Sequence, residues 1–338
     1  MSTYLLRMLF VHTAGTRLVL DGDAVKALRD DARPRRLPLT AIDSIVVFGG
    51  VDVSTPLLVR CGEDGRTVVF LSRNGRPRAV VEGSLERRGL LRREQYWAHF
   101  DDVRRAQLAG SIVRGKIEQM QWGVRQWRRD ASEAHSLRLS DIDQALTQDL
   151  EDIEAADRSS LLGIEGAATR RYFGALALAL KVTEFSGRNR RPPRDPINAL
   201  LSFLYGLSGV ALRGAVHAAG LDPMCGFLHG DRDAQPSLVL DLAEEFRPHA
   251  DRLAVKLLNQ RKLLEKHFAS DLAGAISLTD DGREIVFDAW HRHRTSNISV
   301  RGLQQEISHA ALPIVQANRF ANALRSGDCY EPHRARVR

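Results

Sequence analysis

The sequence predicts an α+β protein, in which a small N-terminal domain built from a β-sheet or β-sandwich precedes a larger all-α domain. The chain has 338 residues, enough for one large domain or two of ordinary size. Its first part consists of short β-branched and apolar runs separated by Gly, Asp and Asn, whereas apolar residues recur at helical spacing from residue 93 onwards. We expect a β-rich domain over 1–84, a charged linker over 85–92, a helical domain over 93–325 and a basic tail over 326–338.

Five stretches of the N-terminal part have the composition of β-strands. They are short and rich in Val, Leu, Ile and Phe, and turn-forming residues separate them. These stretches cover residues 3–12, 16–22, 36–50, 56–65 and 66–75. The following segment, RNGRPRAVVEGS, either adds a last strand or begins the linker.

Helical spacing of apolar residues continues through most of the remaining chain. The expected helical segments cover residues 93–129, 141–157, 163–184, 196–220, 237–265 and 301–325. Residues 281–290, DGREIVFDAW, instead indicate a short strand pair or a loop, and the final EPHRARVR is expected to be a frayed, basic end.

Composition limits the classes of protein to which this chain can belong. Hydrophobic residues make up 43% of the chain, but no apolar run reaches the roughly 20 residues of a membrane-spanning helix. The N-terminal MSTYLLRMLFVHTAGTR lacks the layout of a signal peptide. The three cysteines are far apart, which disfavours a disulfide framework or a zinc motif and suits a reducing cytoplasm. We therefore expect no membrane partner.

The charge of the chain fits a polyanionic partner. The net charge is +7 and the isoelectric point is about 9.6. Only six of the 49 cationic residues are Lys, and Arg is the better bidentate ligand of phosphate. A GC-rich genome, which favours Arg codons, explains the same excess, so charge alone leaves the partner open.

Residues 226–248, GFLHGDRDAQPSLVLDLAEEFRP, set three carboxylates in an apolar helical pattern. On a helical wheel Asp241 lies between Glu244 and Glu245, so it can converge with either of them on one point. Like charges at these spacings repel by about 0.2–0.5 kcal/mol unless a cation lies between them. In a divalent metal site the bound cation would remove this repulsion. In an ordinary amphipathic helix the acids would instead face water, or one of them would pair with Arg247. The spacing decides neither this question nor which Glu would be the ligand.

His229 precedes this helix in an apolar setting. A lone His there is often a hydrogen-bonded core residue, but the loop GDRDAQP allows the imidazole to fold back over the helix. One imidazole with carboxylates suits Mg²⁺ or Mn²⁺ better than structural Zn²⁺, which prefers Cys and several His.

Glu165 is the one acid in the helical stretch LLGIEGAATRRYFGALALAL. A first-turn Glu can simply stabilise the helix dipole. The small residues that follow it, however, leave it open to a bulky partner, and Arg170 and Arg171 lie within two turns. A carboxylate beside two guanidiniums suits a metal-assisted phosphodiester site as well as it suits surface ion pairs.

The stretch SGRNRRPPRDP is strongly basic and cannot be helical at its prolines. We expect an exposed loop whose arginines contact phosphate rather than only water. These arginines are Arg188, Arg190, Arg191 and Arg194. A second basic stretch, WHRHR, holds His291 and His293, which we expect to face solvent or phosphate rather than a metal.

Four segments together resemble a known protein family. GGVDVSTPLLVRCGEDGRTVVFLSRNGRP, GIEGAATRRYF, GRNRRPPRDPINALLSFLYGL and GFLHGDRDAQPSLVLDLAEEFRP occur here in this order. They are similar to segments of the CRISPR-associated integrase of spacer acquisition, the Cas-one family. The resemblance covers most of residues 1–325, and the combination is more specific than any one of its segments.

The resemblance implies a β domain used for dimerisation and a helical catalytic domain with a site for Mg²⁺ or Mn²⁺. Its metal ligands match Glu165, His229 and Glu244, and a further acidic position that supports the site matches Asp241. The third ligand is Asp in some members of the family, and here it is Glu, one methylene longer. Glu245 is then left to pair with an Arg or to face solvent.

The resemblance also implies a reaction, partners and a setting. The family forms homodimers and, with a small Cas-two partner, a heterohexamer that inserts short DNA segments at CRISPR repeats, so the expected partners include double-stranded and single-stranded DNA of the prespacer and the repeat. This is metal-dependent endonuclease and integrase chemistry in the prokaryotic cytoplasm, part of antiviral defence, in which a 3′ hydroxyl attacks a phosphodiester. Two alternatives remain open: a stand-alone metal-dependent nuclease on branched DNA in repair, and a DNA-binding scaffold without catalysis.

Overall fold

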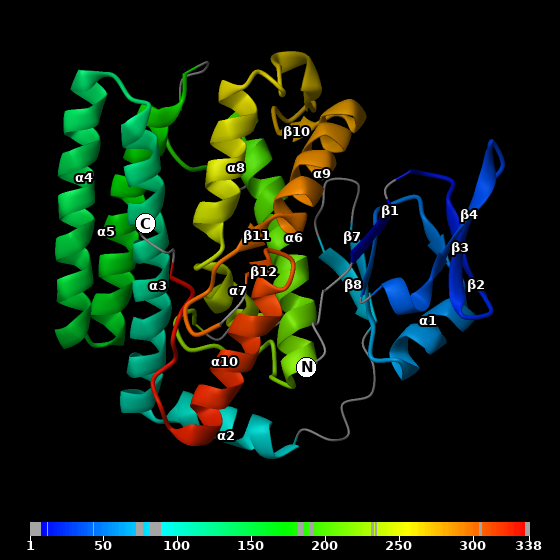
Figure 1. Cartoon of the computed structure of the whole chain (residues 1–338), viewed down its shortest axis with the longest axis horizontal. Helices are drawn as coiled ribbons and strands as arrows, with labels where there is room; N and C mark the ends of the chain where they lie inside the picture. Colours follow the sequence, from blue (N-terminus) through cyan, green and yellow to red (C-terminus); the bar gives the residue numbers. More distant parts are fainter. Residues whose placement is uncertain are drawn as a thin grey trace.

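The chain folds into an N-terminal part made of two sheets and one helix, and a larger helical part (Figure 1). This confirms the α+β prediction. The computed structural model describes residues 8–334 except for 12, 43, 72–76, 82–88, 182–184, 190, 191, 231, 232, 234, 304 and 305. Residues 85–88 of the expected linker lie outside the described residues, and the first helix of the larger part begins at Gly89.

The first sheet has the strand order β1-β5-β7-β8. Its strands are β1 (Met8–Val11), β5 (Ser44–Val47), β7 (Thr67–Leu71) and β8 (Pro77–Val81). The first three run parallel and β8 is antiparallel to β7, so RNGRPRAVVEGS does add a last strand. Every residue of β5 is buried, which explains its unbroken apolar run.

The second sheet has the strand order β4-β3-β2-β6. Its strands are β2 (Arg17–Asp21), β3 (Ala24–Arg29), β4 (Ala32–Pro38) and β6 (Asp52–Val53). All seven residues of the edge strand β4 are exposed, and its arginines and prolines discourage pairing with another edge.

Residues 56–65, expected as a strand, instead form most of helix α1 (Thr55–Glu63). That prediction was wrong because PLLVRC was interpreted by its β-branched and apolar content alone. Pro56 suits the first turn of a helix. Leu57 and Cys61, four residues apart, are both fully buried against the two sheets, as one face of a helix requires.

Nine α-helices make up the framework of the larger part over its described residues. They are α2 (Gly89–Phe100), α3 (Asp102–Arg129), α4 (Glu133–Asp152), α5 (Arg158–Ala179), α6 (Pro196–Ala219), α7 (Ser237–Ala243), α8 (Arg247–Asn259), α9 (Asp280–Thr295) and α10 (Leu312–Ser326). Short hairpins join some of them: β9 (Phe268–Ser270) with β10 (Ile276–Leu278), and β11 (Asn297–Ile298) with β12 (Ile307–Ser308). The helices α3, α4 and α5 lie side by side at one end (Figure 1).

The helix expected over 237–265 is interrupted between α7 and α8. Pro248 lies in the first turn of α8, where it has no N–H to donate to the carbonyl of Glu244, one turn earlier. The turn of residues 244–246 therefore separates the two helices. This break decides where Glu244 and Glu245 lie.

Residues 281–290, expected as strands or a loop, belong to helix α9. Thr279 caps its N-terminus by accepting a hydrogen bond from the backbone nitrogen of Gly282. Its buried residues Val286, Ala289 and Trp290 recur at helical spacing. The pattern was misinterpreted because Gly282 and a short apolar run resemble a turn and a strand.

One cluster of buried apolar residues contains side chains from both the N-terminal part and the helical part. Val46 and Phe48 from the first sheet are buried together with Leu200 and Leu204 of α6. Phe48 also makes an edge-on ring contact with Phe287 of α9, with centroids 5.4 Å apart. The first sheet is thus packed against α6 and α9.

Helix α6 is long and apolar enough to cross a membrane by length and composition, which the sequence reading overlooked. Its mean hydropathy over the relevant window is 1.5, and 67% of that window is buried inside the protein. A buried core helix passes the same test, and α6 packs against α7, α8 and α10.

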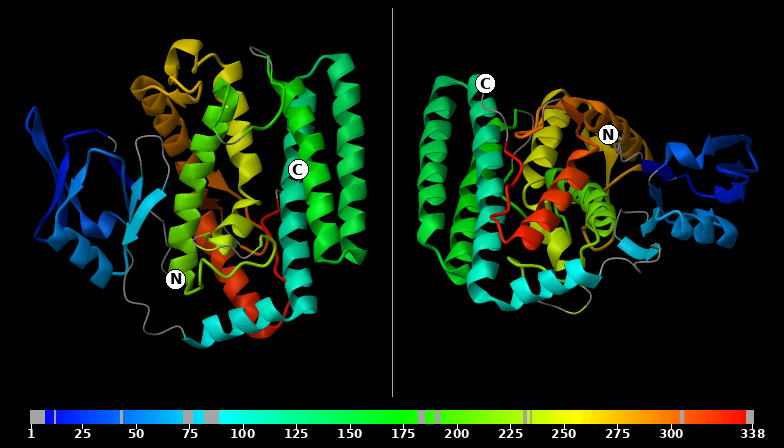
Figure 2. Two further views of the ribbon diagram at one scale, coloured as in Figure 1. Left: turned by 180° about the vertical axis from the view of Figure 1, so that it is seen from behind. Right: turned by 60° about the horizontal axis from the view of Figure 1, so that its bottom comes forward.

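The described part of the C-terminal tail is packed, not frayed. Tyr330 and His333 are 2% and 1% exposed, and Arg334 pairs with Glu118 at 3.2 Å. The segment runs beside α3 in both views of Figure 2. The expectation of a frayed end was wrong for residues 331–334, since it rested on local charge and took no account of what the tail covers; residues 335–338 lie outside the described residues.

Replacing Gly115 by Ala should loosen the tail. A Cβ at this position of α3 would lie 2.4 Å from the Cβ of Pro332, which real Cβ atoms do not tolerate. The gain in helix propensity is smaller than the cost of overpacking, so we expect the protein to lose roughly 1–3 kcal/mol of stability. Denaturant unfolding and limited proteolysis of the C-terminus measure this.

Gly174→Ala on α5 is the matched control, because nothing lies within 4 Å of a Cβ there. We expect it to leave the tail protected and to change stability by at most about 1 kcal/mol, in the stabilising direction. Equal stability and equal protection in the two variants would show that the tail does not pack against Gly115.

Candidate functional site

The loop of residues 226–229 folds around the carboxylate of Asp241, which α7 holds fully buried. Oδ2 of Asp241 accepts hydrogen bonds from the backbone nitrogens of Phe227 at 2.5 Å and Leu228 at 3.0 Å. Its Oδ1 accepts a third from the backbone nitrogen of His229 at 2.9 Å. One buried carboxylate therefore fixes the path of the loop.

The same carboxylate orients the imidazole of His229. Nδ1 lies 2.7 Å from Oδ1 of Asp241, and because a carboxylate only accepts, Nδ1 carries the proton. In the neutral imidazole Nε2 is then a free lone pair, and it lies 3.8 Å from Oε1 of Glu244. Burial lowers the pKa of His229, but the hydrogen bond to Asp241 and the nearby carboxylates raise it, and the net shift is upward.

Glu244 lies in the turn after α7 and is only 2% exposed. Its Oε1 lies 3.1 Å from a guanidinium nitrogen of Arg247, and its Oε2 lies 2.5 Å from Nζ of Lys116. Burial alone would raise the pKa of Glu244, but these two cations lower it to about 2. The carboxylate is therefore ionised near neutral pH.

Glu165 reaches the same point from α5. Its Oε1 accepts a hydrogen bond from the hydroxyl of Thr169, one turn further along the helix, at 2.9 Å. The ammonium group of Lys116 contacts this oxygen as well as Glu244. The structure thus brings Glu165, His229, Asp241 and Glu244 together, with a lysine between two of the carboxylates.

Lys116 is the residue that sequence analysis missed. It lies in the middle of α3 and is 2% exposed, so its charge is offset by the two carboxylates and not by water. A weak signal was available, because only six of the chain's 49 cationic residues are Lys and this one falls on an otherwise apolar helical face. Nothing in the sequence indicated which acids it would face.

The donor set at this point suits a divalent cation. The carboxylates of Glu165 and Glu244 and the free Nε2 of His229 are ligand types that Mg²⁺ and Mn²⁺ accept. Oε2 of Glu244 is buried and has no hydrogen-bond partner of normal geometry among the described residues. The ammonium group of Lys116 shows that the position between the carboxylates accommodates positive charge.

The sequence suggested that Glu245 would face solvent or pair with an arginine. Among the described residues it does neither. It is fully buried and accepts hydrogen bonds from the Tyr330 hydroxyl at 2.6 Å, the His333 backbone nitrogen at 2.8 Å and the Gln316 amide at 3.2 Å. Burial raises the pKa of Glu245 to about 7, against the effect of these bonds. The break after α7 turns this side chain toward the tail, which an unbroken helix would not do.

The two arginines that follow Glu165 have different surroundings. Arg171 pairs with both carboxylate oxygens of Asp149 on α4, each at 2.7 Å. Arg170 is exposed on α5. Of the two, Arg170 is the side chain that a phosphate can approach without displacing an ion pair.

Arg188 is turned into the protein rather than exposed on a loop. Its guanidinium donates to Oδ1 of Asn198 at 2.6 Å and to the hydroxyl of Ser202 at 3.0 Å, and it lies 5.3 Å from the centre of the Tyr205 ring. Arg194 is exposed. Outside the described residues lie Arg190 and Arg191.

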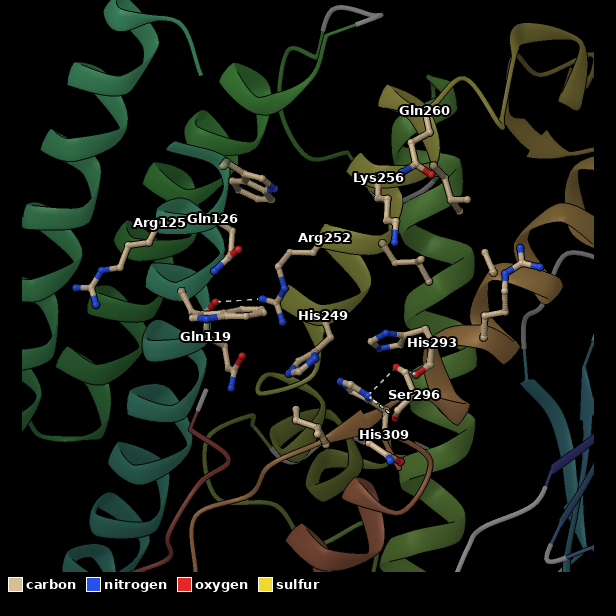
Figure 3. A pocket seen from close by; sticks show the side chains of 18 of the residues that line it. Gln119, Arg125, Gln126, His249, Arg252, Lys256, Gln260, His293, Ser296 and His309 are labelled. Carbon is tan, nitrogen blue, oxygen red and sulfur yellow. Dashed lines mark hydrogen bonds between the residues drawn. The ribbon is translucent and has the colours of Figure 1, made fainter. Parts of the chain in front are cut away.

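A large cavity, which the sequence did not indicate, opens between α3, α8 and α9 (Figure 3). Its volume is about 960 Å³. The lining combines Trp side chains with many cations, and the guanidinium of Arg252 lies 4.1 Å from the centre of the Trp122 ring. The cations that line it are Arg125, Arg129, Arg252, Lys256, Lys262 and Arg292. Several separate segments contribute, so no local motif reveals it.

Comparison with known proteins gives one consistent result. The family described as "CRISPR associated protein Cas1" matches residues 9–292. "CRISPR-associated endonuclease Cas1 2" of Rhodospirillum rubrum is 38% identical, over 97% of this chain and 98% of that protein. "CRISPR-associated endonuclease Cas1 1" of Moorella thermoacetica is 36% identical, over 97% of each.

Solved structures show the same fold. A Cas1 protein from Thermotoga maritima aligns over 96% of this chain and 98% of its own, with a TM-score of 0.80 and 23% identity. A casposase bound to integration product aligns over 98% and 96%, with a TM-score of 0.83 and 20% identity. A Cas6-RT-Cas1–Cas2 complex contains a chain that covers all of this one, over 37% of its own length, with a TM-score of 0.82 and 22% identity.

Asp251, near the site on α8, should make stability depend on pH. It is buried and accepts a hydrogen bond from the Tyr205 hydroxyl at 2.5 Å, and burial raises its pKa from 3.8 to about 6. The folded chain therefore keeps a proton that the unfolded chain releases, so this contribution to stability is full below pH 4 and is lost as pH rises through about 6.

Asp251→Asn should remove this contribution. In metal-free protein, the stability of Asp251→Asn relative to the parent should increase by roughly 1–3 kcal/mol between pH 4 and pH 7, measured by denaturant unfolding. Asp281→Asn, at an exposed position of α9, should show no such trend. A parallel pH dependence of the parent and Asp251→Asn would contradict the upward shift of the Asp251 pKa.

Proposed function

Since this chain belongs to the CRISPR-associated Cas1 family, we propose that it is a metal-dependent DNA endonuclease and integrase that inserts new spacer DNA into a CRISPR array. The observation that carries the proposal is the convergence of Glu165, His229 and Glu244, from α5, a loop and the turn after α7, on one charge-balanced point. The names of the relatives, which are endonucleases, and the likeness to a casposase on its integration product support it.

We propose that Glu165, His229 and Glu244 hold Mg²⁺ or Mn²⁺. When bound, the ion would supply Lewis-acid chemistry, which lowers the pKa of an attacking hydroxyl and offsets charge on the phosphoryl oxygens. Asp241 contributes by holding the proton of His229 on Nδ1, so that Nε2 stays free and correctly aimed. The cations Arg247 and Lys116 beside Glu244 keep its carboxylate ionised despite its burial.

The proposed reaction is a transesterification. The 3′ hydroxyl of the incoming DNA loses its proton to solvent and bonds to a phosphorus atom at a repeat boundary. The bond from that phosphorus to the 3′ oxygen of the cut strand breaks, and this oxygen takes up a proton to become a new 3′ hydroxyl. Lys116 and Arg247 place two positive charges beside the carboxylates, where they would offset the charge of a phosphodiester entering the site. The same residues would cleave DNA when water is the nucleophile.

Basic surfaces outside the site would hold the DNA, both its duplex and its single-stranded ends. The cavity between α3, α8 and α9 offers cations and Trp side chains, the combination that binds the phosphates and bases of a strand. Among the arginines selected from the sequence, the exposed Arg170 and Arg194 are the better phosphate contacts, and Arg171 and Arg188 would first have to leave their partners. Arg190 and Arg191 stay as proposed contacts.

We further propose that the N-terminal β domain, residues 1–84, forms a homodimer, and that two dimers bind a small Cas2-like partner. A solved complex that contains Cas1 and Cas2 includes a chain of the same fold, which supports this assembly. A prokaryotic cytoplasm is the setting in which such a complex would meet a CRISPR array.

Replacing the proposed ligands should abolish chemistry and spare binding. Glu165→Gln, His229→Asn and Glu244→Gln should each reduce strand joining by about a hundredfold or more, because losing the ion costs several kcal/mol of transition-state stabilisation. The measurement is an integration assay with prespacer, repeat DNA and the Cas2-like partner, beside a DNA-binding assay.

Glu151→Gln, at an exposed position of α4, is the matched control and should join strands at the parent rate. Full joining by any of the three ligand variants would refute the assignment of that residue. Cleavage of branched DNA without joining, in the parent protein, would instead indicate the stand-alone nuclease, and metal-independent binding without chemistry would indicate a scaffold.

Lys116→Met should separate the roles of lysine and metal. Without the ammonium group the buried carboxylate of Glu244 and the partly buried carboxylate of Glu165 lose the cation that they share, so metal-free protein should lose roughly 3–5 kcal/mol of stability. Mn²⁺ should then raise the melting temperature of the variant more than that of the parent, because the ion no longer competes with the lysine. Differential scanning fluorimetry with and without Mn²⁺ measures both effects.

Lys181→Met, at an exposed position, is the control for Lys116→Met and should behave as the parent does. If Mn²⁺ stabilised Lys116→Met no more than the parent, the ion would not bind between these carboxylates.

A further inference from the structure

Four histidines gather beside the large cavity, apart from the site described above. His249 comes from α8, His293 from α9, His309 from the segment after β12 and His333 from the tail. Ring centroids lie 4.4 Å apart for His293 and His309, and 5.4 Å apart for His249 and His333. Figure 3 shows His249, His293 and His309 close together at one side of the cavity. Within the described part of the chain, one ring nitrogen from each of these three lies within 4.8 Å of the others.

Several of these ring nitrogens lack hydrogen-bond partners. Nε2 of His249 has none among the described residues, and neither ring nitrogen of His333 has one, although the exposed fraction of His333 is only 1%. Buried polar atoms are nearly always paired, because an unpaired one costs about 1–3 kcal/mol. Unpaired nitrogens beside two further imidazoles therefore indicate a missing ligand.

His309 is held in the tautomer that a metal ligand needs. Its Nδ1 lies 2.9 Å from the backbone oxygen of Ser296, and since a carbonyl only accepts, Nδ1 carries the proton. The hydroxyl of Ser296 donates to the backbone oxygen of His293 at 2.7 Å, so its oxygen is free to accept from the same Nδ1 at 3.2 Å. Nε2 of His309 is left as a lone pair. A backbone carbonyl behind the ring is the usual support of a metal-binding histidine.

The cluster is also in the right charge state. Burial lowers the pKa of His293 and of His333 to about 3, and it lowers the pKa of His249 and of His309 as well. The guanidinium of Arg252 acts in the same direction. All four rings are therefore neutral near pH 7, the form in which imidazole binds a metal.

We propose that His249, His293 and His309 form a second metal site, which binds Zn²⁺ or a similar transition-metal ion. Imidazole nitrogens without carboxylates favour zinc over Mg²⁺ or Mn²⁺, which prefer oxygen. His333 is not among the three histidines whose nitrogens lie within 4.8 Å of one another, but it is buried beside His249 with both nitrogens unpaired, and we assign it the fourth position of a tetrahedral site.

Such an ion would join four segments that are distant in sequence: α8, α9, the segment after β12 and the tail. Helix α8 begins three residues after Glu244, and the tail supplies hydrogen bonds to Glu245. The ion would therefore stabilise the turn that carries Glu244 and would take no part in the reaction on DNA. The sequence analysis had grouped His291 with His293 and assigned neither to a metal. Two positions along a helix differ by a rotation of about 200°, so the two side chains lie on opposite faces of α9. Only His293 turns inward.

The test is zinc uptake by metal-free, full-length protein, measured by competition with a chromophoric chelator. Because Glu165, His229 and Glu244 would bind zinc too, the histidine cluster is tested in a His229→Asn background. This background should bind one zinc ion. Adding His293→Asn or His309→Asn should abolish the uptake, and adding His333→Asn should weaken it.

His291→Asn, on the same helix and exposed, is the matched control and should leave uptake unchanged. Circular dichroism of the metal-free variants checks that each is folded. Co²⁺ bound to the His229→Asn protein should give the ligand-field spectrum of a tetrahedral nitrogen site without a thiolate charge-transfer band, a readout that needs no substitution in the cluster. The proposal is overturned if the His229→Asn protein takes up no zinc, or if folded His293→Asn and His309→Asn proteins take up as much as their background.

Discussion

The end of the helical part that carries the proposed metal site depends on one buried carboxylate, that of Asp241. It accepts three backbone hydrogen bonds from residues 227–229 and a fourth from the His229 ring, so a single side chain sets both the loop and its functional group. The approach is so close that a Cβ at Gly226 would lie 2.8 Å from the Asp241 carboxylate and 2.6 Å from the Cβ of Ser237. Buried charge is costly unless every lone pair is used, and here the loop backbone uses them.

Around this anchor the protein balances charge from several elements. Lys116 comes from α3, Glu165 from α5, and Glu244 and Arg247 from either side of the break between α7 and α8. Lys116 and Glu244 are almost fully buried, so each depends on the opposite charges that the other elements bring to it. The site therefore forms only when the helices pack against one another. The resemblance of local segments to a family predicts this packing but does not show its contacts.

The sequence predicted the class of fold, most of the helices and the residues Glu165, His229, Asp241 and Glu244, which the structure brings together. Its errors have physical causes. Residues 56–65 and 281–290 are short apolar runs beside turn-forming residues, for which strand and helix patterns coincide, and only burial against the sheets or against α6 decides between them. The break at Pro248 was missed because the acids before it fit an unbroken helix. The partners of Lys116, the cavity and the histidine cluster could not be predicted, because the residues that form them are far apart in sequence.

The tail gives the most consequential of these long-range contacts. Glu245, adjacent to a proposed ligand, is covered by Tyr330 and His333, and Gly115 leaves room for that cover. These two residues lie 85 and 88 positions after Glu245 in the chain. Contacts between such distant positions require the closing of a long loop, so they form slowly compared with the turns of a helix. We therefore expect the turn that carries Glu244 to be among the later parts of the helical core to order during folding.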